Sequence, residues 1–283
     1  MLRSLYAAIS GLRVNQTMLD VTGNNVANVN TVGFKSSQTI FQDTLSQMLT
    51  AGSAGAANQG GTNPIQIGLG VQLAGVATNM GQGAAQTTGV PTNMMIQGDG
   101  MFVVKRGTED MYTRAGAFAF DGQGRLVDPD GDIVQGYMPD AAGNINTAGP
   151  AQDITIPDIV NKGAANPLES YAIADDGTIN GVYADGTQKV LGQVALANFA
   201  NPAGLEKTGD TMYRPSGNSG AAQLNAPGQA GNGKLLTGCL EMSNVDLAQE
   251  FTNLIVAQRG FQANSKVITT SDQVLQDLVN MKQ

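Results

Sequence analysis

The sequence predicts an α+β protein in which helices from the two ends of the chain pair with each other and a mainly-β domain is inserted between them. The residues 243–283 contain no proline and a single glycine, and apolar side chains recur there at sevenfold spacing. The first 27 residues show the same spacing. Heptad rows at both ends, separated by a long stretch of β character, favour a coiled-coil-like inner domain built from both ends of the chain.

The C-terminal segment is the stronger of the two helix predictions. Its main apolar row consists of Leu247, Leu254, Phe261, Ile268 and Leu275. The apolar residues that flank this row are Phe251, Ile255, Val267, Val274 and Val279. Ser243 is the expected N-cap, with Asp246 in the first turn. A helix of roughly 38 residues would be about 57 Å long. A rod of this length is suited to packing lengthwise on other helices.

The N-terminal segment carries a weaker version of the same pattern. Its main row consists of Leu5, Leu12, Leu19 and Val26, and Leu2 and Ile9 begin a companion row that fades along the chain. Gly11 and Gly23 each lower helix propensity by up to about 1 kcal/mol relative to alanine. This helix is therefore expected to need a partner, and the C-terminal helix is the obvious one. The ordinary alternative is an amphipathic helix that packs on a globular core.

The composition excludes several classes of function. The net charge of −8 and the pI of about 4.4 argue against nucleic-acid binding, which depends on Lys and Arg side chains that neutralise phosphates. The chain has no histidine and one cysteine, which excludes intrachain disulfides, multi-thiolate zinc sites and histidine-based acid-base catalysis. The sequence shows no secretory signal pattern and no apolar run that approaches the roughly 18 residues of a membrane span. We expect no cofactor, no membrane insertion and no enzyme activity.

The middle of the chain, residues 68–239, is expected to be all-β. The predicted strands are 71–73, 94–96, 101–104, 117–120, 154–156 and 189–196. Asp-Gly pairs, which favour hairpin turns, occur at 99–100, 121–122, 130–131, 176–177 and 185–186. The preceding residues 36–67 are rich in small side chains and are interpreted as a linker.

Two long motifs lie where the terminal segments meet the middle of the chain. One covers the end of the N-terminal helix and the residues after it, and the other covers the residues before the C-terminal helix and its first half. The first runs from Gly23 to Lys35 and contains Asn24, Asn25, Asn28, Gly33, Phe34 and Lys35. The second begins with Leu240-Glu241 and contains Ser243, Asn244, Val245, Asp246, Gln258 and Arg259. Clustered asparagines followed by Gly33 and an aromatic side chain are typical of a helix end that turns into a defined loop.

Both motifs resemble the signatures of the bacterial flagellar rod and hook proteins. The first is similar to "NN-aliphatic-AN…T-x-GF-K", and the second to "LE-x-SNVDL…E…MI-x-AQR-x-(F/Y)". The segments 96–102 and 112–118 resemble the hairpin "I-x-G-x-GFF…YTR-x-G-x-F" of the same family, although Met101 replaces an aromatic residue and 92–95 departs from the usual pattern. The segments 31–35 and 256–262 look most like those of the short hook proteins of Gram-positive bacteria.

The resemblance implies a structural subunit of the flagellar hook, with the distal rod subunit as the alternative. Residues 1–35 and 240–283 would form an inner tube, and 68–239 an outer domain. The implied partners are copies of the chain itself, the rod and hook-filament junction proteins, the hook cap and the flagellar type III export apparatus. The implied location is extracellular, in the hook or the basal-body rod. The expected interface residues are Leu5, Ile9, Leu12, Leu19, Val26, Leu247, Phe251, Leu254, Phe261, Ile268 and Leu275.

Other signals are given plainer interpretations. Asp128, Asp130 and Asp132 have a calcium-like spacing, but the glycine and glutamate of an EF-hand loop are missing, and a polar turn is expected. Asn15 belongs to a glycosylation sequon inside the predicted helix, and Cys239 is interpreted as a small packing residue. A secreted adhesin with oligomerising helices is the alternative from another class of protein.

Overall fold

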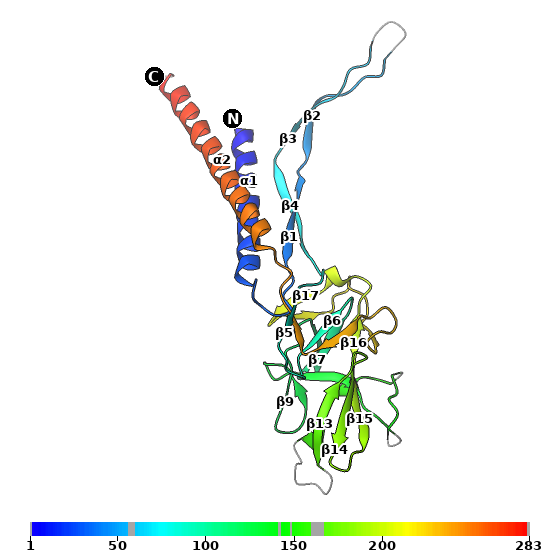
Figure 1. Ribbon diagram of the computed structural model, residues 1–283. Helices are drawn as coiled ribbons and strands as arrows, with labels where there is room; N and C mark the ends of the chain where they lie inside the picture. The colour runs from blue at the N-terminus through cyan, green and yellow to red at the C-terminus, as the bar shows by residue number, and fades with distance from the viewer. Residues whose placement is uncertain (1, 56–59, 141–142, 148, 160–166, 282–283) are drawn as a thin grey trace. The chain divides into compact units, whose positions relative to one another are not determined.

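Two long helices, one from each end of the chain, lie side by side in the computed structural model (Figure 1). The structure describes residues 2–55, 60–140, 143–147, 149–159 and 167–281. It divides into two compact units. The first unit comprises residues 1–27, 37–79 and 245–283, and the second comprises residues 28–36 and 80–244.

The first unit combines the helices with two-stranded ribbons. Helix α1 spans Leu2–Ala27 and helix α2 spans Leu247–Asn280. Strand β1 (Ser37–Asp43) pairs antiparallel with β4 (Val71–Thr78), and β2 (Ser46–Thr50) pairs antiparallel with β3 (Ile65–Gly68). Three of these strands begin within the range that was interpreted as a linker.

The start of α2 differs from the sequence prediction. Asp246, not Ser243, is the N-cap: its carboxylate accepts hydrogen bonds from the backbone N–H groups of Ala248 and Gln249. The helix therefore has 34 residues, four fewer than expected. The α+β class is confirmed by two terminal helices and a mainly-β middle.

The second unit is built around a sheet of 13 strands. Its main path follows the order β13, β14, β15, β11, β7, β8, β18 and β17. These strands are β7 (Met101–Arg106), β8 (Glu109–Thr113), β11 (Ile133–Tyr137), β13 (Leu168–Ile173), β14 (Thr178–Tyr183), β15 (Gln188–Val194), β17 (Glu206–Gly209) and β18 (Met212–Arg214). The short strands β9 (Ala119–Phe120), β10 (Leu126–Val127), β12 (Gln152–Asp153), β16 (Leu196–Asn198) and β19 (Gln223–Asn225) pair beside this path.

Two further strand pairs complete the second unit. Strand β6 (Met94–Gln97) pairs with β20 (Lys234–Thr237), and β5 (Ala85–Thr87) pairs with β21 (Cys239–Glu241). The main core contains Phe102 and Phe118, whose rings meet edge to face at 5.1 Å. Two of the predicted Asp-Gly pairs form turns in which the glycine adopts the left-handed backbone conformation: Gly177 and Gly186 have φ values of 77° and 79°.

Candidate assembly site and the motif cluster

Three of the motifs meet at one buried ion pair inside the second unit. Lys35 Nζ lies 2.6 Å from Glu241 Oε1, and both side chains are 0% exposed. The ammonium also donates to the carbonyl of Gly81, and the N–H of Gly83 donates to Glu241 Oε1. The two charged residues, 206 positions apart in the chain, thus share a direct hydrogen-bonded ion pair through Glu241 Oε1. Lys35 belongs to the first motif and Glu241 to the second.

Arg114, from the predicted hairpin motif, approaches the other oxygen of the same carboxylate. Its Nη1 lies 3.6 Å from Glu241 Oε2, an atom that accepts no hydrogen bond among the described residues. The guanidinium donates to the carbonyls of Ile96 and Gly98. Burial lowers the pKa of Lys35, opposed in part by Glu241, and burial also lowers the pKa of Arg114. One buried carboxylate therefore attracts two buried cations, in direct contact with Lys35 and at a longer distance from Arg114.

Gly33 and Phe34 fit this cluster for steric reasons. Gly33 has φ of 70°, and a Cβ at this position would lie 2.5 Å from the backbone nitrogen of Ala115. Its N–H donates to the carbonyl of Glu241. The ring of Phe34 lies 5.0 Å from Lys207 Nζ. Only glycine allows the backbone to approach this closely.

The remaining polar motif residues also make defined contacts. In the second unit, Asn244 accepts a hydrogen bond from the N–H of Ser36 and donates to the carbonyl of Gly81. In the first unit, Asn25 exchanges two hydrogen bonds with the backbone of Ser37 and donates to Glu250. Asn25 therefore links α1, β1 and α2.

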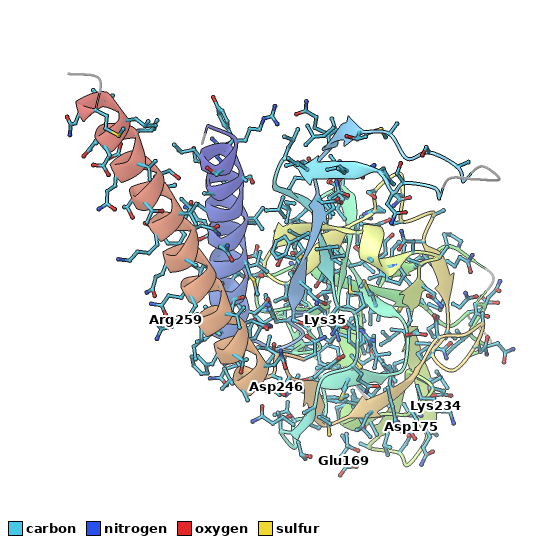
Figure 2. The ribbon with its side chains drawn as sticks, turned by 90° about the horizontal axis from the view of Figure 1, so that it is seen from above. Lys35, Glu169, Asp175, Lys234, Asp246 and Arg259 are labelled. Atoms are coloured by element: carbon cyan, nitrogen blue, oxygen red, sulfur yellow. The ribbon has the colours of Figure 1, made fainter. Side chains whose placement is uncertain are left out.

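Other motif positions have simpler environments. Ser243 is buried, Val245 and Asn28 are half-buried, and Asn24 is exposed. Gln258 and Arg259 are exposed on α2, and Figure 2 shows Arg259 on the side of the helix away from α1. Arg259 donates to Gln262 of its own helix.

Glycine and asparagine residues face one another where α1 and α2 pack together. A Cβ on Gly11 would lie 2.7 Å from Asn264 Nδ2, and a Cβ on Gly260 would lie 2.7 Å from Asn15 Oδ1. Ala257 is fully buried beside them. The pairing is reciprocal, which fixes the antiparallel register of the two helices. Sequence reasoning treated Gly11 only as a helix-weakening residue and assigned no role to Gly260.

None of the predicted interface residues is fully buried in the isolated chain. Phe251 is 51% exposed, and Leu247 and Phe261 are also exposed. The half-buried members are Leu5, Ile9, Leu12, Leu19, Val26, Leu254, Ile268 and Leu275. The apolar rows therefore keep accessible surface after α1 and α2 have paired.

The two ribbons add a further apolar surface that was not anticipated at this extent. Their exposed large apolar residues are Ile40, Phe41, Leu45, Met48, Leu49, Ile65, Ile67, Leu69, Leu73 and Val76. Isolated two-stranded ribbons are marginally stable in water, and contiguous exposed apolar patches mark interaction sites. Together with the helices, the first unit therefore exposes many large apolar side chains.

Other candidate sites have structural explanations. Asp128 accepts hydrogen bonds from the backbone N–H groups of Asp130 and Asp132, as the predicted polar turn requires. The carboxylate of Asp132 pairs with Arg106 at 2.7 Å. Cys239 is buried. Within the described residues, no helix meets the length and apolarity that crossing a membrane requires.

Comparison with known proteins identifies three family matches along the chain. A model described as flagella basal body rod protein matches residues 5–35, the flagellar hook protein FlgE/F/G D1 domain matches residues 95–181, and the flagellar basal body rod FlgEFG protein C-terminal matches residues 236–281. The first and third contain Lys35 and Glu241, and the second contains Arg114.

Full-length relatives agree with these matches. The chain is 48% identical over 283 residues to the flagellar basal-body rod protein FlgG of Bacillus subtilis, with all of both chains covered. It is 32% identical over 441 residues to the flagellar hook protein FlgE of Borreliella burgdorferi, again with all of both chains covered. It is 38% identical over 280 residues to FlgG of Caulobacter vibrioides, covering 97% of each chain. The chain therefore belongs to the family of bacterial flagellar rod and hook proteins.

Proposed function

We propose that this chain is a subunit of the tubular flagellar axis and that it polymerises through its terminal helices. The observation that carries the proposal is the apolar surface that α1, α2 and the ribbons leave exposed. A tube grows through heterologous contacts that do not close, so each copy must present two different complementary surfaces. The predicted interface residues on both helices supply apolar side chains for such contacts.

In the proposed subunit, helices α1 and α2, which lie within residues 1–35 and 240–283, form a coiled-coil-like inner tube, and the part of residues 68–239 that belongs to the second unit forms the outer domain. The proposal draws on the heptad rows and on the side-by-side position of α1 and α2. The segment 36–67 would contact neighbouring copies, because strands β1 and β2 expose Ile40, Phe41 and Met48. The three side chains are 51%, 37% and 56% exposed.

We place the subunit in the flagellar hook, a flexible joint that transmits torque from the rod to the filament. Support comes from the hook-like segments 31–35 and 256–262 and from the similarity to hook proteins of two spirochaetes, Borreliella burgdorferi and Treponema pallidum. Charged residues make up only 13% of the chain, and a surface of low charge suits many weak contacts that exchange as the joint bends.

The distal rod is the second candidate, and a specific observation favours it. Relatives named as basal-body rod proteins match the chain at higher identity, and the Bacillus subtilis protein does so over an alignment of 283 residues, the length of this chain. The hook relatives align over 441 and 462 residues, so they contain long additional segments.

Electron microscopy of a deletion strain separates the two candidates. A basal body with a complete rod and no hook is expected for a hook subunit, whereas a truncated rod contradicts the hook assignment. The deletion strain carrying the unmodified gene in trans is the control, and it should regain the missing part.

The proposed partners are copies of the chain, the rod and hook-filament junction proteins, the hook cap and the type III export apparatus. The relatives are structural flagellar proteins, and the buried Lys35–Glu241 contact is interpreted as a structural lock rather than a catalytic site.

A truncation test must keep this lock. A fragment of residues 28–244 retains Lys35, Glu241 and all of the second unit, and it should be soluble, folded and unable to polymerise. Polymers formed by this fragment would contradict the role of the helices.

A further inference from the structure

Helix α2 extends past the beginning of α1 and leaves an uncovered apolar end. Gly11 lies opposite Asn264 and Asn15 lies opposite Gly260 in the antiparallel pair. In this register Leu2 lies opposite about residue 273, because each step along one helix is matched by one step back along the other. Figure 1 shows α2 continuing beyond the end of α1. We call residues 274–281 the overhang.

The overhang is amphipathic. Val274, Leu278 and Met281 recur at i, i+4 and i+7 and therefore share one face, on which Asp277 also lies. They are 48%, 49% and 82% exposed. Among the described residues, the carboxylate of Asp277 has no ion-pair partner.

A groove of about 520 Å³ in the same unit has complementary chemistry. Helix α1 contributes Tyr6, Ile9 and Arg13, and strand β4 contributes Val71 and Leu73. The ring of Tyr6 is exposed and the wall is mostly apolar. The guanidinium of Arg13 is the charged group of this lining, and within the described part of the chain it has no carboxylate partner.

The overhang cannot fill the groove of its own chain. Ile9 lies opposite about residue 266, so Leu278 is displaced along the helix axis by about 18 Å. Groove and overhang are different surfaces, as a heterologous, propagating contact requires. Their charges are opposite, Arg13 in the groove and Asp277 on the overhang.

We propose that the overhang of one copy docks in the groove between α1 and β4 of a second copy, with Asp277 beside Arg13 and with Val274, Leu278 and Met281 against the apolar wall. This inference rests on the proposed polymerisation and specifies the surfaces that carry it. The axial displacement makes it an interaction between copies and not a closure within one copy.

Cysteine cross-linking of the full-length chain tests the contact. Three separate variants, Ile9→Cys, Leu278→Cys and Gln276→Cys, are made in a Cys239→Ala background. Gln276 lies on the opposite face of the overhang and provides the matched control. A mixture of the Ile9 and Leu278 variants is polymerised under reducing conditions, which establishes that both fold and assemble, and is then oxidised. A disulfide requires Cα atoms about 4.4–6.8 Å apart, so it reports a close contact.

Disulfide-linked dimers in the Ile9 and Leu278 mixture, with at most traces in the Ile9 and Gln276 mixture, are the expected result. Polymers that form without this cross-link, or that cross-link equally in both mixtures, overturn the docking while the proposed function stands. A chain with the natural sequence that forms no polymer contradicts the proposed function itself.

Charge reversal provides the second test. Arg13→Glu and Asp277→Lys should each lower the yield of polymer severalfold, because each places like charges together in the contact. The double variant restores opposite charges and should return the yield toward that of the natural chain. Loss in both single variants without recovery in the double variant overturns the pairing of Arg13 with Asp277.

Discussion

Replacing Glu241 should destabilise the second unit more than any other single charge change. In Glu241→Gln the shape is kept but the negative charge is lost, and the ammonium of Lys35 and the guanidinium of Arg114 remain buried without it. Lys35 and Glu241 are both 0% exposed, so water cannot screen the remaining charges. Breaking a buried pair in this way costs about 3–5 kcal/mol. For a unit of this size the loss corresponds to a decrease in Tm of about 6–20 °C.

The assay is thermal and urea unfolding of the full-length monomer, followed by tyrosine fluorescence. Tyr6 is the one tyrosine of the first unit, and the other five tyrosines lie in the second, whose unfolding the signal therefore reports. Lys105→Met is the matched control: Lys105 lies 4.0 Å from Asp153 with both side chains about 40% exposed, and such surface pairs contribute about 0–1 kcal/mol.

A double-mutant cycle separates the ion pair from general damage. Lys35→Met combined with Glu241→Leu removes both charges, leaving Arg114 with its two carbonyl acceptors. The double variant should lose less stability than the sum of the single variants. A loss of under about 1 kcal/mol in Glu241→Gln, or strict additivity, would refute the proposed lock.

Three further predictions concern other parts of the chain. Gly11→Ala should stabilise α1 less than Gly23→Ala, because its Cβ would displace the side-chain amide of Asn264 where the helices pack, whereas Gly23→Ala has open space and should gain about 1 kcal/mol; helicity measured by circular dichroism during thermal unfolding compares the two variants. Asp246→Ala removes the N-cap of α2 and should cost about 1 kcal/mol of helix stability, while a Ser243→Ala variant that cost the helix more would contradict this cap. Burial raises the pKa of Tyr213 from 10.0 to about 12, so the stability that depends on its neutral phenol is complete below pH 10 and decreases as the pH rises through 12, by up to about 3 kcal/mol. Urea unfolding between pH 9 and 12 should show this decrease relative to Tyr213→Phe, and identical profiles of the two proteins would contradict it.

The helices and the hairpin turns could be predicted because their signals are local. A sevenfold apolar row indicates a helix with an apolar face, and an Asp-Gly pair indicates a turn, regardless of the rest of the chain. The N-cap was ambiguous for the same reason. Ser243 and Asp246 are both capping residue types, and tertiary contacts decided between them, because Ser243 is buried in the second unit.

Strands β1, β2 and β3 of the ribbons could not be predicted because their pattern lacks the usual signal, whereas the start of β4 was predicted at 71–73. All residues of β1 are half-buried or exposed, and all residues of β2 and β3 are exposed, so no alternation of buried and exposed residues distinguishes these strands from a linker. A strand that is half-buried on one face of a sheet has that alternation. Strand β7 has four buried residues in succession and was predicted from its apolar run.

The sequence by itself determined the α+β class, the two terminal helices and the family, because these depend on local periodicity and on motif residues. Tertiary structure alone decided that Lys35 and Arg114 meet the carboxylate of Glu241 and that Gly11 and Gly260 lie where the two helices pack together. The physical reason is that a single sequence records the type of each residue but not its distant neighbour. The contribution of a buried charge to stability, or the effect of adding a Cβ to a glycine, depends on the atom that lies opposite it in the folded structure.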